Sequence, residues 1–397
     1  MSALSNPNLR TGICGLGAVS GYGWGKESLW DGVLSGRSAA ELVSVDGYQY
    51  LAARPQPENP EITGRIRQDH PSQYGRALFA ATREAVADGR ARGWVPGARV
   101  GMIGAGSLGD IGYRRAYLHE HQGRMRNRDY LGLMPSTAPA MLLRDLGFSG
   151  GPVMNIQAAC AATNVALVVA WQWLVSGFAT DVIVAACDFS AVPEDVDQFR
   201  KMGALVGKGE PLDVCRPFQK GSSGFIVGEA AATLIISRRS DAPYGLFLGG
   251  SMVQDPYHPI SLNPDLTELV NTFEGALATA GVGRQDITYL YTHGTGTAQN
   301  DASEIGVAEK VLDPGVTFLA TKPLTGHCQG ASAGVEGILA LLGLERGVMP
   351  SVMPVTSAYP ALANGPDRRR DGLVLKTAMG MGGFNSAVVY APVDFDS

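Results

Sequence analysis

Apolar runs alternate with helical patterns along most of the chain. Runs that predict buried strands lie at 10–17, 99–104, 181–187, 230–237, 245–250, 287–292, 372–378 and 386–391. Helical spacing of apolar positions lies at 26–35, 74–92, 161–175, 265–281 and 332–343. Strands that alternate with helices favour a mostly parallel sheet with helices on both faces, so the pattern predicts an α/β protein.

The second part of the chain repeats the order of the first. A helix rich in glycine and alanine leads into an apolar strand at 160–187, and again at 331–378. No low-complexity segment or long linker separates the two parts. We therefore predict two halves, 1–243 and 244–397, that pack as one body.

Composition and charge exclude several classes of protein. Hydrophobic residues make up 45% of the 397 and charged residues 17%, which is enough apolar material for a large core. The net charge of −5 means that the chain lacks the excess of positive charge that binding to nucleic acid or to an anionic membrane requires. Residues 146–180 carry no charge, but the polar side chains among them, such as Gln157 and Gln172, favour a buried helix over a membrane span.

The five cysteines are odd in number, widely spaced and without a CxxC pair. This usage disfavours a disulfide framework and a structural zinc site, so we expect no metal. The N-terminus lacks the basic-then-apolar layout of a signal peptide. Together these features predict a reducing compartment, the cytoplasm.

One cysteine lies where a nucleophile would be activated. Cys160, in Gln157-Ala-Ala-Cys-Ala-Ala162, stands at the predicted start of the long apolar helix. Free amides and a partial positive charge of roughly half a unit there favour a thiolate. Most free cysteines are simply small buried hydrophobes, and that is our interpretation of the other four.

Two of the six histidines follow predicted apolar strands in glycine-rich turns. His293 opens His-Gly-Thr-Gly-Thr297, and His327 comes five residues after Lys322. In α/β sheets, ligands bind at the carboxyl ends of strands, and glycine lets backbone and ligand approach closely. The remaining histidines have no such context, and we interpret them as solvated or structural: His70, His119, His121 and His258.

These motifs resemble the elongating β-ketoacyl-ACP synthases of the thiolase superfamily. The resemblance rests on Cys160, His293, the Lys322-(x)4-His327 spacing and the turn Met379-Gly-Met-Gly-Gly-Phe-Asn-Ser386, and it extends over essentially the whole chain. It implies a thiolase-like fold: two βαβαβαββ halves stacked as a five-layer αβαβα sandwich, normally dimeric. Initiating condensing enzymes and chalcone-synthase-like enzymes have a Cys-His-Asn pattern instead, and degradative thiolases have Cys-His-Cys.

The resemblance also implies the reaction. An acyl group moves from a carrier thioester to Cys160, and the N–H groups of Cys160 and Met381 form the oxyanion hole. Malonyl-ACP then loses carbon dioxide, and its enolate attacks the acyl-enzyme. Neutral His293 and His327 would donate to the enolate oxygen, and one of them would also assist decarboxylation. No resident cofactor is implied, because phosphopantetheine arrives on the acyl carrier protein.

The resemblance to this family also implies roles for several further residues. Lys322 pairs with a glutamate in the family, and Glu336 stands at the matching position. Thr295 and Thr297 match threonines that contact the pantetheine arm. In the C-terminal turn, Met381, Gly382 and Phe384 are the expected substrate-binding residues, with Met381 as a gate to the acyl pocket.

Three departures from the family pattern favour a specialised pathway. Met381 stands where the family usually has Phe, and Phe384 replaces a small polar residue. The segment Gln219-Lys-Gly-Ser-Ser-Gly-Phe225 lacks the usual carboxylates, which puts its hydrogen bonds to the site in doubt. We therefore expect a type II polyketide or polyene ketosynthase rather than a housekeeping fatty-acid enzyme.

Two alternative functions remain. A chain-length-factor-type partner subunit shares the fold but typically lacks the cysteine, and a degradative thiolase needs a second cysteine in the C-terminal turn. The chain is expected to form a homodimer, or a heterodimer with a chain-length-factor-like subunit. Basic clusters that could receive an acidic carrier protein, or be ordinary solvated charges, lie at 114–115, 124–128 and 368–370.

Overall fold

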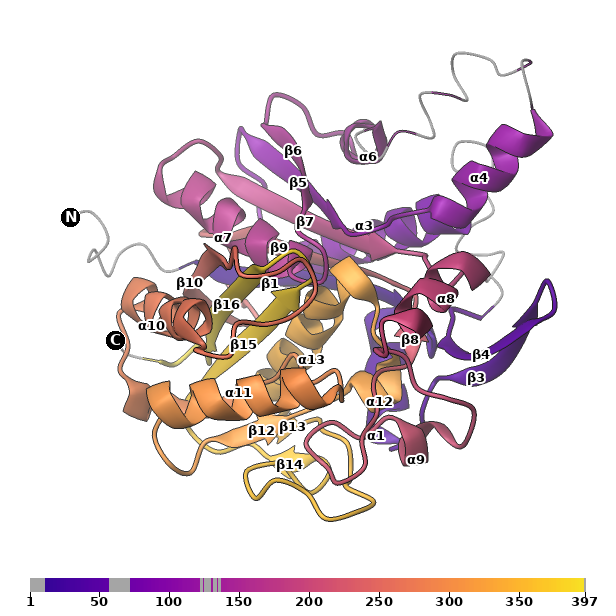
Figure 1. Cartoon of the computed structure of the whole chain (residues 1–397). Coiled ribbons are helices and arrows are strands. Elements are labelled where there is room, and N and C mark those ends of the chain that lie inside the picture. Colours follow the sequence, from indigo (N-terminus) through magenta and orange to yellow (C-terminus); the bar gives the residue numbers. More distant parts are fainter. Residues whose placement is uncertain are drawn as a thin grey trace.

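The computed structural model describes residues 11–56, 72–121, 124, 130, 134 and 137–395. His70 and two arginines of the basic cluster at 124–128, Arg126 and Arg128, lie outside the described residues. Within the described part, the chain builds two five-stranded sheets of identical topology, with helices between and outside them (Figure 1).

The sheet of the first half has the spatial order β1 (Gly12–Ser20), β9 (Ala230–Ser237), β7 (Asp181–Asp188), β5 (Val100–Gly106), β6 (Val153–Gln157). The first two pairings are antiparallel and the last two parallel. The second half repeats this with β10 (Gly245–Gln254), β16 (Phe384–Ala391), β15 (Leu373–Gly380), β11 (Ile287–Tyr291) and β12 (Thr317–Leu319). The predicted duplication is therefore confirmed as a duplication of topology.

In the described part of the chain, the two sheets pair with each other at a single edge. β1 and β10 pair through Gly12 with Leu246 and Ile13 with Gly245. This short antiparallel contact joins the ten strands, with β2 (Gly23–Trp24) beside β1, into one continuous sheet. The predicted junction between the halves, at 243/244, lies in the segment that connects β9 to β10.

Two apolar helices form the middle layer between the sheets. α7 (Ala162–Val175) and α13 (Ser332–Arg346) contact each other and strands of both halves. α7 has no charged residue, and every residue of α13 up to Leu344 is buried. A helix that is apolar on all sides has to be buried, and each fully buried leucine stabilises the fold by about 2 kcal/mol. The uncharged stretch at 146–180 is thus a core helix, as predicted, and none of the described helices is long and apolar enough to span a membrane.

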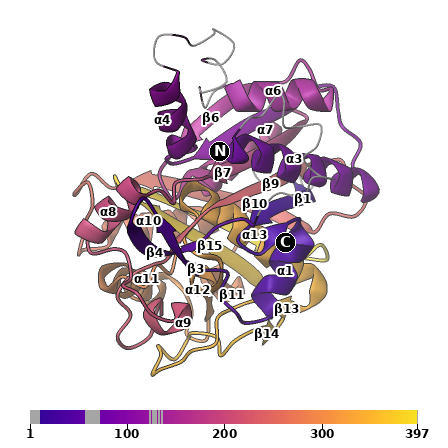
Figure 2. The same ribbon diagram turned by 90° about the vertical axis from the view of Figure 1, so that its right-hand side faces the viewer.

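The outer layers consist of amphipathic helices. α3 (Gln73–Ala91) and α6 (Thr137–Leu146) cover the sheet of the first half, while α10 (Thr267–Ala280) and α11 (Ala298–Val311) pack on the second half. Figures 1 and 2 show α6 and α11 on opposite sides of the molecule. The layer order is therefore αβαβα, which confirms the predicted thiolase-like fold.

Shorter elements complete the chain around this framework. They are α1 (Lys26–Leu34), β3 (Glu41–Val45), β4 (Tyr48–Ala53), α4 (Ile111–Glu120), α8 (Pro193–Lys201), α9 (Pro211–Val214), β8 (Val227–Gly228), α12 (Lys322–Thr325), β13 (Val348–Met349) and β14 (Asp367–Arg368).

Candidate active site

The topology brings the N-termini of the two central helices together. Cys160 follows β6 and precedes α7, and residues 327–331 stand at the same place before α13. Thr163, in the first turn of α7, donates to the carbonyl of Gly330 at 2.5 Å. The duplicated fold therefore places the cysteine of one half against the His327 loop of the other, although 166 residues separate them in the chain.

Cys160 is held in a tight turn and is only 6% exposed. Ala159 immediately before it has a φ of 45°, a left-handed conformation that is uncommon for a residue with a side chain. Gly380 lies against the turn, because a Cβ there would be 2.9 Å from the Ala158 carbonyl and 3.2 Å from Cys160 N. The backbone before Met381 thus runs directly beside the amide of the cysteine.

His327 contacts the cysteine sulfur directly. Its Nε2 lies 3.1 Å from Cys160 Sγ, and its Nδ1 lies 2.8 Å from Ser332 Oγ. The edge-to-face ring of Phe225, with centroids 4.8 Å apart, fixes the imidazole plane. Both ring nitrogens are therefore engaged, and the histidine is buried with 1% exposure.

His293 is oriented by a buried carboxylate. Glu304 on α11 accepts the N–H groups of His293 and Gly294, at 2.6 and 2.8 Å, and thereby anchors the turn that follows β11. The rings of His293 and His327 are perpendicular, with centroids 5.4 Å apart. The two histidines that the sequence singled out therefore lie side by side at the cysteine.

Behind the histidines lies a buried cluster of three charges. Lys322 Nζ is 2.6 Å from Glu336 Oε1, which confirms the predicted ion pair, and Lys376 Nζ is 2.8 Å from Glu336 Oε2. All three side chains are at most 2% exposed. Two ammonium groups share one carboxylate, so the cluster keeps a net positive charge beside the reacting groups.

These surroundings determine the protonation states. Burial, and then the charge of Lys322, lowers the pKa of both His293 and His327 well below 6.5, so both rings are neutral near pH 7. Burial raises the pKa of the Cys160 thiol to about 12, although Lys322 lowers it in part. The expectation of a resting thiolate is thus wrong: desolvation outweighs the positive charges, and Cys160 rests as a thiol beside a neutral base.

A cavity of about 280 Å³ reaches these groups. Cys160, His293 and His327 line it together with Thr295, Thr297 and Met381, and the hydroxyls of the two threonines lie 3.1 Å apart. Lys322 is not among the lining residues, which agrees with its pairing to Glu336. Neither Gly382 nor Phe384 lines the cavity, and Phe384 is 38% exposed, so their substrate contacts stay predictions.

His258 also lines the cavity, which the sequence did not indicate. Its Nδ1 accepts the N–H groups of Ile260 and Ser261, at 3.1 and 3.0 Å, so the ring orders the loop at the cavity wall. His119 is exposed and His121 stacks on Tyr117, in agreement with solvated or structural roles.

The segment 219–225 forms its hydrogen bonds without the usual carboxylates. Ser222 donates to the carbonyl of Gly296 at 2.7 Å, inside the turn that carries His293. Gln219 Oε1 accepts the N–H of Val355 at 2.8 Å. Asp301 accepts the N–H groups of Phe218 and Gly296 at 2.7 and 3.1 Å. The Ser222 hydroxyl therefore holds this segment to the His293 turn, and the Asp301 carboxylate ties the adjoining Phe218 to the same turn.

Two of the basic clusters, 114–115 and 368–370, form ion pairs. Arg115 pairs with Glu194, Arg370 lies 4.0 Å from Asp367, and Arg369 lies 3.9 Å from Asp371. These contacts are ordinary surface ion pairs, and the docking of a carrier protein at the basic clusters stays a prediction.

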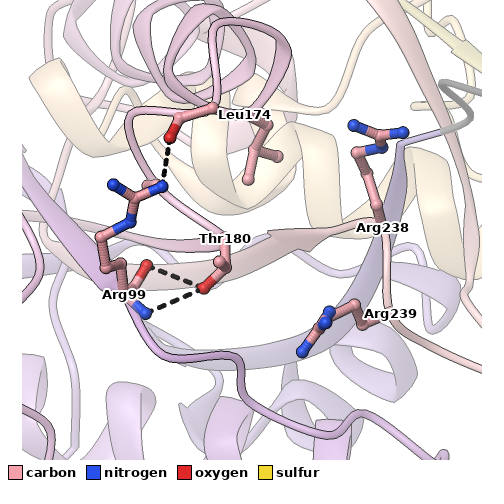
Figure 3. Close-up of a pocket in the computed structure, with 7 residues that line it drawn as sticks. Arg99, Leu174, Thr180, Arg238 and Arg239 are labelled. Carbon is pink, nitrogen blue, oxygen red and sulfur yellow. Dashed lines mark hydrogen bonds between the residues drawn. The ribbon is translucent and has the colours of Figure 1, made fainter.

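A second cavity, of about 350 Å³, lies at the other end of α7 (Figure 3). The Arg99 guanidinium there donates to the carbonyl of Gly177 at 2.5 Å, just after the helix ends, and Arg238 and Arg239 lie opposite. Among the described residues that line this cavity there is no cysteine, histidine or carboxylate.

Two family models match the chain. The Beta-ketoacyl synthase N-terminal domain matches residues 10–242, and the Beta-ketoacyl synthase C-terminal domain matches residues 244–356. The chain belongs to the β-ketoacyl synthase family.

Similar proteins include a chloroplastic synthase and a subunit of a polyketide synthase. The chain is 30% identical over 268 residues to the chloroplastic 3-oxoacyl-(acyl-carrier-protein) synthase II of Arabidopsis thaliana, covering 64% of this chain and 49%, about half, of that relative. It is 27% identical over 422 residues to the tetracenomycin polyketide synthase ketoacyl synthase alpha subunit of Streptomyces glaucescens, covering 96% and 97% of the two chains. The solved structure described as the ishigamide ketosynthase/chain length factor has the same fold, with a TM-score of 0.85 at 24% identity over 96% of this chain and 98% of that one.

Sequence reasoning missed four buried polar residues of this site. Lys376 and Glu304 are described above, and Ser332 contacts His327. Asp188, at the end of β7, accepts four backbone N–H groups at 2.7 to 3.0 Å, including that of Gly330. The charge of Lys376 within an apolar strand was a usable signal, because a charge in a buried strand needs a partner. No pattern in the sequence marks the other three.

Proposed function

We propose that this chain catalyses a decarboxylative Claisen condensation. An acyl group held as a thioester on Cys160 would react with malonyl-ACP to give 3-oxoacyl-ACP. The observation that carries the proposal is the contact of 3.1 Å between Cys160 Sγ and His327 Nε2, with His293 beside it at the end of an open cavity. A nucleophile next to a base, and two neutral N–H donors at one point, are the groups that this chemistry needs.

The first half-reaction is acyl transfer. The Cys160 thiol gives its proton to Nε2 of neutral His327, and the sulfur adds to the carbonyl of the carrier thioester. The N–H groups of Cys160 and Met381 would stabilise the oxyanion, and the close approach of Gly380 to Cys160 N supports this pairing. The carrier sulfur then leaves with the proton from Nε2.

The second half-reaction forms the new carbon–carbon bond. Malonyl-ACP would enter past Thr295 and Thr297, which line the cavity and could hold the pantetheine arm. As carbon dioxide leaves, negative charge develops on the thioester oxygen. His293 and His327 can donate to it because both stay neutral at pH 7. The buried net positive charge of the Lys322 cluster favours this enolate.

Two alternatives are less well supported. A chain-length-factor-type subunit, which would not condense, fits the fold but typically lacks the nucleophile, whereas this chain has Cys160 against His327. A degradative thiolase needs a second cysteine in the C-terminal turn, where Met379 and Met381 line the cavity instead.

For partners, we propose an acyl carrier protein and a second ketosynthase-type subunit, in a homodimer or a heterodimer with a chain-length-factor-like chain. β6 is the edge strand of its sheet, and its Val153 and Met154 are 43% and 41% exposed. An unpaired apolar edge strand favours pairing with another chain.

With Met381 in the cavity, a type II polyketide or polyene pathway is the preferred assignment over fatty-acid elongation. Five free buried thiols favour the cytoplasm.

Intact-mass measurements test the proposal. Incubation with acyl-ACP should add one acyl group to the wild type and none to Cys160→Ala. Cys160→Gln should release carbon dioxide from malonyl-ACP without condensation, which a thiolase would not do, and His327→Ala should abolish the release. If His327→Ala released carbon dioxide at the wild-type rate, the proposed role of His327 would be overturned. The absence of an acyl adduct on the wild type would overturn the proposed function.

A further inference from the structure

The contact between His327 and Ser332 has a consequence for the proton on His327. Nδ1 of the ring lies 2.8 Å from Ser332 Oγ, which has no other hydrogen-bond partner among the described residues. A hydroxyl can donate or accept, whereas a backbone N–H in its place could only donate. Ser332 can therefore satisfy Nδ1 whether or not that nitrogen carries the proton.

The other ring nitrogen faces a group that changes during the reaction. In the free enzyme the Cys160 thiol has two acceptors, His327 Nε2 at 3.1 Å and Gln329 Oε1 at 3.5 Å, and the nearer one is the imidazole. A thiol that donates to Nε2 leaves the ring proton on Nδ1, where Ser332 accepts it. Once Cys160 is acylated, its sulfur has no proton to give.

We propose that Ser332 is a positioning residue that lets His327 carry its proton on Nδ1 in the free enzyme and on Nε2 in the acyl-enzyme. In the first state Nε2 is a base for the thiol, and in the second Nε2–H is a donor for the enolate. The inference rests on the proposed function, since it assigns one histidine to both half-reactions.

The proton count balances in each step. During acyl transfer the S–H proton passes to Nε2 and then to the departing carrier sulfur, so the ring is again neutral with its proton on Nδ1. In the acyl-enzyme one proton leaves Nδ1 for solvent, and one is taken up at Nε2 from water. The Ser332 hydroxyl rotates from acceptor to donor, and no net charge is created in the buried site.

Removing the hydroxyl should affect the two half-reactions differently. In Ser332→Ala a proton on Nδ1 would be buried without an acceptor, which costs free energy. The ring should then hold its proton on Nε2 in both states, with the thiol donating to Gln329 Oε1. His327 would remain an enolate donor but would no longer be a base for the thiol.

The test combines kinetics with histidine NMR. Ser332→Ala should slow acylation of Cys160 by acyl-ACP about a hundredfold, the lower end for loss of a general base. Carbon dioxide release from malonyl-ACP, measured in the Cys160→Gln background where no S–H holds the proton on Nδ1, should stay within about twofold. Ser332→Thr, which keeps the hydroxyl, should restore acylation. Equal losses in both half-reactions, or no loss in either, would overturn the proposal.

The tautomers can be read directly in protein labelled with [15N]histidine. Alkylation of Cys160 by iodoacetamide removes the S–H without any substrate, so the His327 signals should change from the Nδ1–H to the Nε2–H pattern in the wild type. Ser332→Ala should show the Nε2–H pattern before and after alkylation. A wild-type ring with one tautomer in both states contradicts the inference. Because this measurement needs no turnover, its failure can be distinguished from failure of the proposed function.

Discussion

The ammonium group of Lys376 lies 2.8 Å from Glu336 Oε2, and neither side chain is more than 2% exposed. Lys376 Nζ also donates to the carbonyl of Thr292, at 3.3 Å, one residue before His293. Burial lowers the pKa of Lys376, and the carboxylate of Glu336 opposes this shift. A strand residue thus links the charge cluster to the histidine turn.

The pairing of Lys376 with Glu336 predicts that substitutions of these two residues destabilise the protein by different amounts. Glu336→Gln leaves two buried ammonium groups without a counter-ion and should lower the free energy of unfolding by about 3 to 5 kcal/mol. Lys376→Met keeps the Lys322–Glu336 pair and should lower the free energy of unfolding by a smaller amount. Urea unfolding measures both. Glu345→Gln is the control, because Glu345 forms a partly exposed ion pair with Arg92 and should cost no more than about 1 kcal/mol. A Glu336→Gln protein as stable as the control would contradict this account.

The raised pKa of Cys160 predicts how its alkylation depends on pH. With a thiol pKa of about 12, the reactive thiolate is a small fraction at neutral pH. That fraction, and hence the iodoacetamide rate, should rise about tenfold per pH unit from pH 7 to 9. If Cys160 and His327 formed a thiolate–imidazolium pair, the alkylation rate would instead be independent of pH over this range. Peptide mass spectrometry follows the adduct on Cys160, and Cys160→Ala shows the background from the other cysteines.

The lowered pKa values of the two histidines predict how the rate of decarboxylation responds as the pH falls. A histidine with an ordinary pKa of 6.5 would lose about three quarters of its neutral form at pH 6. The pKa values of His293 and His327 lie well below 6.5, so the neutral donors persist as the pH falls. Carbon dioxide release by Cys160→Gln should therefore be nearly constant from pH 7.5 to 6. A half-maximal rate near pH 6.5 would show that one ring titrates normally.

Glu304 should be essential for positioning His293. Its two oxygens accept the N–H groups of His293 and Gly294, and Thr377 also donates to Oε1 at 2.8 Å. In Glu304→Gln one acceptor becomes an N–H₂ group that faces another donor, so the turn should shift. We expect decarboxylation to fall about tenfold or more, since a misplaced donor loses the stabilisation of an oxyanion. Glu309→Gln on the same helix, with an exposed side chain, should keep full activity.

Sequence patterns predicted the framework because the strongest physical signals are local. The two apolar helices before β7 and β15, and the buried strands, follow from uninterrupted hydrophobic runs. Short edge strands such as β6 and β12 were not predicted, since three to five residues with mixed polarity carry no clear period. α11 was missed as well, because its buried face includes polar side chains such as Glu304.

The site was predictable where a helix start or a turn of small residues marked it. Cys160, His293 and His327 stand in turns with glycine or alanine neighbours, and the fold does bring them together. Their supporting groups come from distant segments: Glu304 from α11 and Lys376 from β15. The protonation state of Cys160 was predicted wrongly, because the depth of its burial is a property of the assembled fold.

Met381 should set how strictly the cavity selects acyl chains. It lines the cavity next to Cys160 and packs on an apolar cluster that includes Phe199, Leu205 and Phe225. A methionine side chain is unbranched and adapts its shape, so it can turn aside for acyl groups of different lengths. Met381→Phe replaces it with a rigid ring and should narrow the range of acyl-ACPs that acylate Cys160. Competition between short and long acyl-ACPs, read by intact mass, gives the ratio of adducts. Met353→Phe, at a position that is 62% exposed, is the control and should leave the ratio unchanged. An unchanged ratio in Met381→Phe would mean that selection occurs elsewhere along the cavity.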